Sequence, residues 1–93
     1  MEWKKYSDDN LPKVGEEVLA YNNKWVDEDY NPRGFRIGFI DGEGDFRSAY
    51  WWDEQDTYIS ISKEICKSDL DFYSEHIDNT EPEYWIELPN LKI

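Results

Sequence analysis

The sequence predicts an α+β fold, in which a small antiparallel sheet of about five strands is accompanied by one short helix near residues 69–77. Two observations predict it: apolar and polar residues alternate in several short segments, and glycine or proline separates these segments. The length of 93 residues fits a single domain, residues 1–93. Aromatic residues make up 17% of the chain, which supplies large side chains for a core and argues against intrinsic disorder.

Three strands are predicted in the first half of the chain, over Glu17–Tyr21, Phe35–Ile40 and Phe46–Trp52. Alternation is clearest in the second of them, and the third is rich in aromatic residues, which favour strands. The segment between these two strands, Asp41–Asp45, contains Gly42 and Gly44 and predicts a hairpin turn.

The hairpin also has a predicted register. A turn centred on Glu43 places Phe39 opposite Arg47, and the pairs further from the turn follow from that pair. Because side chains alternate along a strand, one face of the hairpin then carries only apolar side chains, and we expect it to be the core face. Its members are Phe35, Ile37, Ala49 and Trp51.

Two more strands are predicted in the second half of the chain. Residues Thr57–Ser62 alternate again, and we expect Ile59 and Ile61 to point inward. The last predicted strand is Glu83–Leu88. Together the strands predict an open antiparallel sheet or a partly closed SH3-like barrel.

The predicted helix lies between these two strands. Ser68 and Asp71 form a Ser-x-x-Asp pattern, which is typical of the first turn of a helix. The following residues place apolar side chains near one helical stripe, so the helix is expected over Asp69–Ile77.

The chain is strongly acidic, since 22 Asp and Glu against 10 Lys and Arg give a formal net charge of −12. Residues 69–87 contain acidic side chains but no lysine or arginine. A field of this sign repels nucleic-acid phosphates and anionic lipids, so direct binding to nucleic acid or to a membrane is not expected. Two interpretations stay open: the acidic surface keeps a small protein in solution, or it attracts a basic partner.

The cellular compartment is predicted from two features. Cys66 is the only cysteine, so no intrachain disulfide can form. The sequence has neither a signal-peptide pattern nor an apolar run of about 20 residues. We therefore expect a cytoplasmic protein.

Three features resemble catalytic or metal sites, and each lacks a requirement. Asp41–Asp45 spaces carboxylates like the start of an EF-hand loop, but Trp52 stands at the twelfth position, where a glutamate is needed. His76 has no nucleophile associated with it by any motif, and Cys66 has no CxxC partner. We therefore expect no catalytic residue, no metal and no cofactor, and a function other than that of an enzyme.

Both ends of the chain carry a further pattern. It consists of Trp3, Asp9, Leu11-Pro12, Gly15-Glu16, Val18-Leu19 and Tyr21 at the start, and of Trp85-Ile86-Glu87-Leu88-Pro89 at the end. This pattern resembles the DUF551 family, which occurs largely in bacteriophages and mobile elements and has no established activity. The segment Tyr58–Glu83 lies outside the resemblance. The resemblance implies a phage-related context but no site residue, and we expect Trp3 and Trp85 to be buried rings.

One predicted function is a small binding module that recognises a protein or a small ligand through exposed aromatic side chains. Neighbouring rings in a strand point to opposite faces, so Trp51 and Trp52 cannot both enter one core. One of them is either exposed, as at many interfaces, or packed in a second core beneath residues 58–83. The candidate binding residues are Trp25, Tyr30, Tyr50, Trp51 and Trp52.

The alternative function is an acidic, DNA-mimic-like inhibitor of a host nuclease or defence protein, in which carboxylates stand in for phosphates. The net charge, the acidic segment and the phage-like resemblance favour it. Its surface would consist of Asp69, Asp71, Glu75, Asp78, Glu81 and Glu83.

Overall fold

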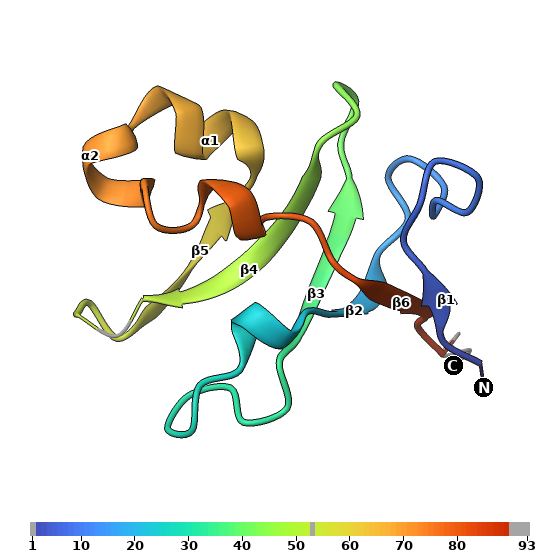
Figure 1. Ribbon diagram of the computed structural model, residues 1–93, viewed down its shortest axis with the longest axis horizontal. Coiled ribbons are helices and arrows are strands. Elements are labelled where there is room, and N and C mark those ends of the chain that lie inside the picture. The colour runs from blue at the N-terminus through green and yellow to red at the C-terminus, as the bar shows by residue number, and fades with distance from the viewer. Residues whose placement is uncertain (1, 53, 90–93) are drawn as a thin grey trace, which may run out of the picture.

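Six antiparallel strands form one sheet, in the order β1-β6-β2-β3-β4-β5 (Figure 1), in the computed structural model, which describes residues 2–52 and 54–89. The strands are β1 (Lys4–Lys5), β2 (Val18–Tyr21), β3 (Phe35–Ile40), β4 (Phe46–Trp52), β5 (Thr57–Ile61) and β6 (Tyr84–Glu87). The two edges, β1 and β5, do not pair with each other within the described residues. The prediction of a small antiparallel sheet is confirmed, but the sheet is open and the barrel alternative is wrong.

The five strands expected from alternation are present with nearly the expected bounds. The sixth strand, β1, was not predicted, because two residues are too short to show any alternation. On β5, Ile61 is buried as expected and Ile59 is half-buried.

The predicted hairpin register is confirmed, since Phe39 pairs with Arg47. The predicted core face is wrong. Ile37 is 47% exposed, whereas Ile40 and Phe46, on the other face, are almost completely buried. The core is therefore built on the face of the hairpin that also carries Gly38 of β3.

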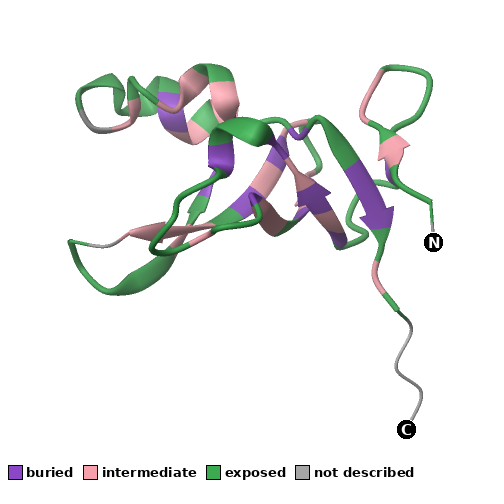
Figure 2. Cartoon of the chain, turned by 60° about the horizontal axis from the view of Figure 1, so that its bottom comes forward, coloured by how far each residue is buried: buried purple, intermediate pink, exposed green. Residues whose placement is uncertain are grey.

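Gly38 explains why that face can be buried. A β-carbon at Gly38 would lie 2.6 Å from Cζ of Phe46, so the absence of a side chain leaves the space that the Phe46 ring fills. Rings from other parts of the chain pack over the same face, and the buried residues gather in the central strands (Figure 2). The core cluster consists of Val18, Ala20, Trp25, Ile40, Phe46 and Trp85, with Tyr6 packed against it.

The hairpin turn at residues 41–45 is confirmed, and its acidic residues have a structural role. The Asp41 side chain accepts hydrogen bonds from the backbone N–H groups of Glu43 and Asp45, both at 3.0 Å. Its second carboxylate oxygen lies 3.4 Å from Nη2 of Arg47. Gly44 adopts a positive φ of 89°, which glycine permits at no steric cost.

The helical segment differs from the prediction. Its first helix, α1, spans Lys63–Ser68 and is capped by Ser62, whose Oγ accepts a hydrogen bond from Ile65 N at 3.3 Å. Ser68, the predicted cap, is the last residue of α1. A serine stands before both possible starts, and packing of the buried Cys66 selects the earlier one.

Only short helical turns follow within the range predicted for the helix. They are α2 (Leu70–Tyr73) and the 3₁₀-helix η2 (Ile77–Asn79), and another 3₁₀-helix, η1 (Asn23–Trp25), follows β2. The longest described helix has six residues, and none in the described parts of the chain is long and apolar enough to cross a membrane.

Candidate ligand-binding cleft

Strands β3 and β4 pair only next to their turn. Their register runs from Ile40↔Phe46 to Gly38↔Ser48 and stops there, although β4 continues to Trp52. Beyond this point β3 remains paired with β2, and β4 remains paired with β5. The two strands therefore diverge away from the turn, as Figure 1 shows.

A cleft of about 640 Å³ opens where the strands diverge. Three consecutive residues of each strand line it, residues 35–37 of β3 and residues 49–51 of β4. Side chains alternate between the two faces of a sheet, so consecutive residues can line one cavity only if it lies along the strand edges. The other walls are formed by residues between 24 and 31 and by Leu19, Tyr58, His76 and Asn79.

Three aromatic side chains stand together in this cleft. The Trp51 ring lies 4.9 Å from the Tyr58 ring in an edge-on arrangement and 6.1 Å from the Tyr30 ring, measured between centroids. Tyr58 and Tyr30 are exposed, while Trp51 is half-buried. The indole Nε1 of Trp51 is buried and has no acceptor among the described residues.

Trp25 lines the cleft from the core side. Its ring is only 5% exposed, contrary to the expectation of an exposed binding residue, and its Nε1 donates a hydrogen bond to the carbonyl of Asn79 at 2.7 Å. Asn22 caps η1 by accepting a hydrogen bond from Lys24 N at 2.8 Å. Trp25 is therefore a fixed wall that joins η1 to η2.

The Arg36 side chain lies between the rings of Trp25 and Tyr50. Its guanidinium carbon is 4.4 Å from the centroid of Trp25 and 5.2 Å from that of Tyr50, and its Nη1 lies 3.4 Å from Oγ of Ser48. Burial lowers the pKa of Arg36 to about 10, while Tyr50 and Cys66 oppose this shift. The side chain is thus a partly buried cation at neutral pH.

His76 also lines the cleft, beside Tyr50. Its ring lies 4.9 Å from the Tyr50 ring, and its Nε2 is 3.3 Å from a carboxylate oxygen of Glu75. Burial lowers the pKa of His76, Glu75 opposes the shift, and Arg36 adds to it. His76 is half-buried beside the cleft rather than a free surface residue.

The cleft offers little for covalent chemistry. Serine, threonine and cysteine do not occur among its lining residues. Cys66 is completely buried in α1, and burial raises the pKa of its thiol although Arg36 opposes this. In the described parts of the chain, no cluster of three or more His, Cys, Asp or Glu side chains could hold a metal ion.

The remaining predicted site residues lie elsewhere. Trp52 does not line the cleft; it pairs with Thr57, on the face that also carries Ile59 and Ile61. The side chains at 51 and 52 thus point to opposite faces, as their adjacency requires. Trp25, Tyr50 and Trp51 all line the cleft, whereas Trp52 does not.

The acidic segment does not form the single helix expected for a DNA mimic, since it is divided among α2, η2 and the turns around them. Several of its carboxylates are engaged within the protein. Glu75 contacts His76, Glu81 lies 3.7 Å from Lys63 Nζ, and Glu83 accepts a hydrogen bond from Asn23 N at 2.6 Å. Glu87 also lies 3.2 Å from Lys4 Nζ, and all the acidic residues of the segment, Asp69, Asp71 and Asp78 included, are exposed.

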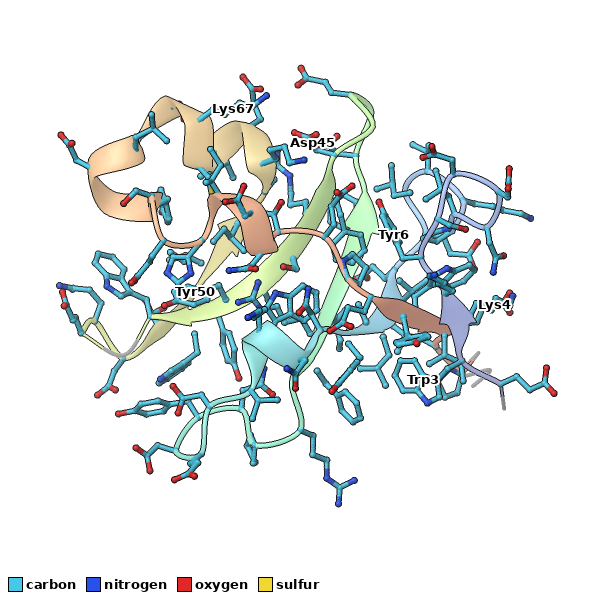
Figure 3. All side chains as sticks on the ribbon, viewed as in Figure 1. Trp3, Lys4, Tyr6, Asp45, Tyr50 and Lys67 are labelled. Atoms are coloured by element: carbon cyan, nitrogen blue, oxygen red, sulfur yellow. The ribbon has the colours of Figure 1, made fainter. Side chains whose placement is uncertain are left out.

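A second aromatic surface was missed by the sequence analysis. Trp3, Tyr21, Phe35 and Tyr84 surround a depression of about 300 Å³. Trp3 is 41% exposed and stacks on Phe35 at 5.6 Å, so the expectation of a buried Trp3 is wrong, whereas Trp85 is buried as expected. Only the pairing of Tyr21 with both Phe35 and Tyr84 reveals this surface. It lies at the other end of the sheet from Tyr50, as the position of Trp3 in Figure 3 shows.

Comparison with protein-family models, with curated proteins and with solved structures finds no match for this chain. The resemblance to the DUF551 family therefore stays a prediction from the sequence.

Proposed function

We propose that this protein is a non-enzymatic binding module, and that the cleft between β3 and β4 holds a small ligand with an aromatic or apolar body. The observation that carries the proposal is the early end of the β3–β4 ladder, which leaves a cavity of about 640 Å³ between two strand edges. Small-molecule sites typically measure about 300–1,000 Å³ and are lined mainly by apolar and aromatic side chains. The rings of Tyr30, Trp51 and Tyr58 match this description.

Binding is favoured over catalysis by the residues of the cleft. Nucleophilic catalysis needs a nucleophile within hydrogen-bond reach of a base. His76 and Asp27 are candidate bases among the described lining residues, but serine, threonine and cysteine are missing from them.

The cleft is also better supported than the acidic-inhibitor alternative. A phosphate mimic needs carboxylates that are free to meet a basic groove. Glu75, Glu81 and Glu83 already contact basic or N–H groups of the protein itself.

The proposal is tested by recording two-dimensional ¹H–¹⁵N NMR spectra while small aromatic compounds are added. We expect saturable shifts at the Trp51 indole and at Ala49. A Tyr58→Ala variant should bind about fivefold more weakly, since an exposed ring at the cleft contributes about 1 kcal/mol. Trp3→Ala is the matched control, because Trp3 is an exposed ring outside the cleft, and it should bind normally. An absence of saturable binding, or shifts confined to the surface around Trp3, would contradict the proposal.

A further inference from the structure

Arg36 is a cation whose hydrogen-bonding capacity is largely unused. A guanidinium carries five N–H donors in one plane. The structure gives this group one hydrogen bond, the long one of 3.4 Å to Ser48. Trp25 and Tyr50 approach the guanidinium as ring contacts, and ring contacts cover its faces without satisfying the donors in its plane.

No acidic side chain of the described residues forms an ion pair with Arg36. This is unexpected in a chain with 22 acidic residues. Asp27 is the one carboxylate among the described residues that line the cleft, and its Oδ1 already accepts hydrogen bonds from the backbone N–H groups of Asp29 and Tyr30, at 2.9 and 3.3 Å.

The cleft therefore has the opposite local charge to the whole protein. Among the described residues that line it, the cations Arg36 and Lys24 outnumber the single carboxylate, Asp27, while the chain has a net charge of −12. Two donor groups that line it have unused hydrogen-bonding capacity: the Arg36 guanidinium makes one long hydrogen bond, and Trp51 Nε1 has no acceptor among the described residues. Such N–H donors form their strongest hydrogen bonds with a ligand that supplies acceptor atoms and negative charge.

We infer that the ligand of this cleft carries a carboxylate, which Arg36 binds through two parallel N–H···O hydrogen bonds while the body of the ligand packs against Trp51, Tyr58 and Tyr30. The inference rests on the proposed function and adds the chemical class of the ligand. A planar carboxylate matches the fork of a guanidinium. A single negative charge also suits a cleft with one permanently charged arginine better than a phosphate dianion does, because the surrounding protein repels anions.

The test uses three probes with the same phenyl body and different charge: phenylacetate, phenylacetamide and 2-phenylethylamine. Their affinities for the wild-type protein are measured by NMR titration at pH 7. We expect phenylacetate to bind about tenfold more tightly than phenylacetamide, as for a charge-assisted hydrogen bond against a neutral one. The net charge of the protein favours the amine, so a preference for the carboxylate must come from the cleft itself.

The outcomes separate this inference from the proposed function. If phenylacetamide binds in the cleft as tightly as phenylacetate, the carboxylate assignment is overturned and the proposed function stands. If none of the three probes binds saturably in the cleft, both are overturned. Phenylphosphonate serves as a fourth probe, and tighter binding of it than of phenylacetate would replace the carboxylate by a phosphate-like group.

Variants assign the effect to Arg36. Arg36→Met should remove the preference for phenylacetate and leave the affinity for phenylacetamide within about twofold, because it keeps an unbranched apolar chain in place of the arginine methylenes and removes the charge. Arg36→Lys should keep only part of the preference, since it retains the charge without the fork. Arg33→Met is the matched control, because Arg33 is exposed and does not line the cleft. A preference that survives in Arg36→Met would contradict the inference.

Discussion

The ring of Phe46 lies over Gly38 so closely that a β-carbon on Gly38 would meet its Cζ atom at 2.6 Å. This contact joins β4 to β3 near the last pair of their ladder, Gly38↔Ser48. The contact anchors the buried face of the hairpin between this last pair and the turn. The cleft opens beyond the last pair, away from the turn.

The contact predicts that Gly38→Ala lowers the free energy of unfolding by about 2 kcal/mol, because an added methyl group in a packed core forces its neighbours to move. Urea unfolding followed by circular dichroism measures the change. Gly42→Ala is the control, since a β-carbon there meets no atom within 4 Å, and its effect should stay within about 0.5 kcal/mol. Equal effects of the two substitutions would show that the Phe46 contact is unimportant.

The turn carboxylate predicts a pH-dependent stability. Burial alone would raise the pKa of Asp41, but hydrogen bonds from Asp45 N and Glu43 N and the nearby Arg47 outweigh it and lower the pKa below the ordinary value of 3.8. A carboxyl group with a lowered pKa in the folded state stabilises the protein at pH values above its ordinary pKa. This stabilisation is lost as the pH falls through the folded-state value.

We therefore expect Asp41→Asn to lower the free energy of unfolding by about 1 kcal/mol at pH 6. The difference from the wild type should shrink progressively as the pH falls below the ordinary value of 3.8, because the carboxyl group is then protonated first in the unfolded and afterwards in the folded protein. Thermal unfolding at several pH values measures both effects. Glu43→Gln changes an exposed acid of the same turn and should have little effect; a constant difference for Asp41→Asn across this range would argue against the charged form as the cause.

Tyr6 predicts a second pH dependence, at the alkaline end. Burial raises its pKa from 10.0 to about 12, and Glu81, Asp45 and Asp8 add to the shift. The phenol stabilises the folded state at pH values below 10, and this contribution is lost as the pH rises toward 12, since the unfolded chain releases the proton first. Near-ultraviolet absorbance should show one tyrosine ionising late. This late step should be missing in Tyr6→Phe and unchanged in Tyr58→Phe, which alters an exposed ring.

Cys66 predicts slow thiol chemistry. Its side chain is completely buried, and burial raises the pKa of the thiol, with Arg36 opposing the shift. An aromatic disulfide reagent should react with it only when the protein unfolds, because the thiolate is the reactive species and the reagent must reach it. Ser68→Cys in a Cys66→Ala background supplies an exposed thiol on the same helix, which should react at once. Rapid labelling of Cys66 in the native protein would contradict this burial.

Local structure was largely predictable from the sequence. Alternation located β2, β3 and β4 within a residue, and Gly42 and Gly44 located the turn between the last two. Such signals are short-range, because alternation and turn geometry depend on neighbouring residues only. The helix shows the limit of this reasoning: Ser62 and Ser68 are both suitable caps, and the burial of Cys66 within α1 favours the earlier one.

The candidate site was predictable only in part. Tyr50 and Trp51 could be named from the sequence because adjacent rings in a strand cannot share one face. Arg36 and Tyr58 could not, since nothing in their neighbours reveals that β3 and β4 separate. Trp3 was expected to be buried and Trp25 to be exposed, and the structure shows the reverse. The exposure of a ring depends on which distant segments cover it.

The sequence by itself thus determined five of the six strands, the acidic turn and the pairing of Phe39 with Arg47, all of which follow from contacts between near neighbours in the chain. Tertiary structure decided which face of the sheet is buried, because Trp25, Trp85 and Tyr6 reach it from distant segments. It also decided that a cleft exists. Strand β3 stays paired with β2, and β4 stays paired with β5, so the two halves of the sheet separate and leave Arg36 between Trp25 and Tyr50 without an acidic partner among the described residues.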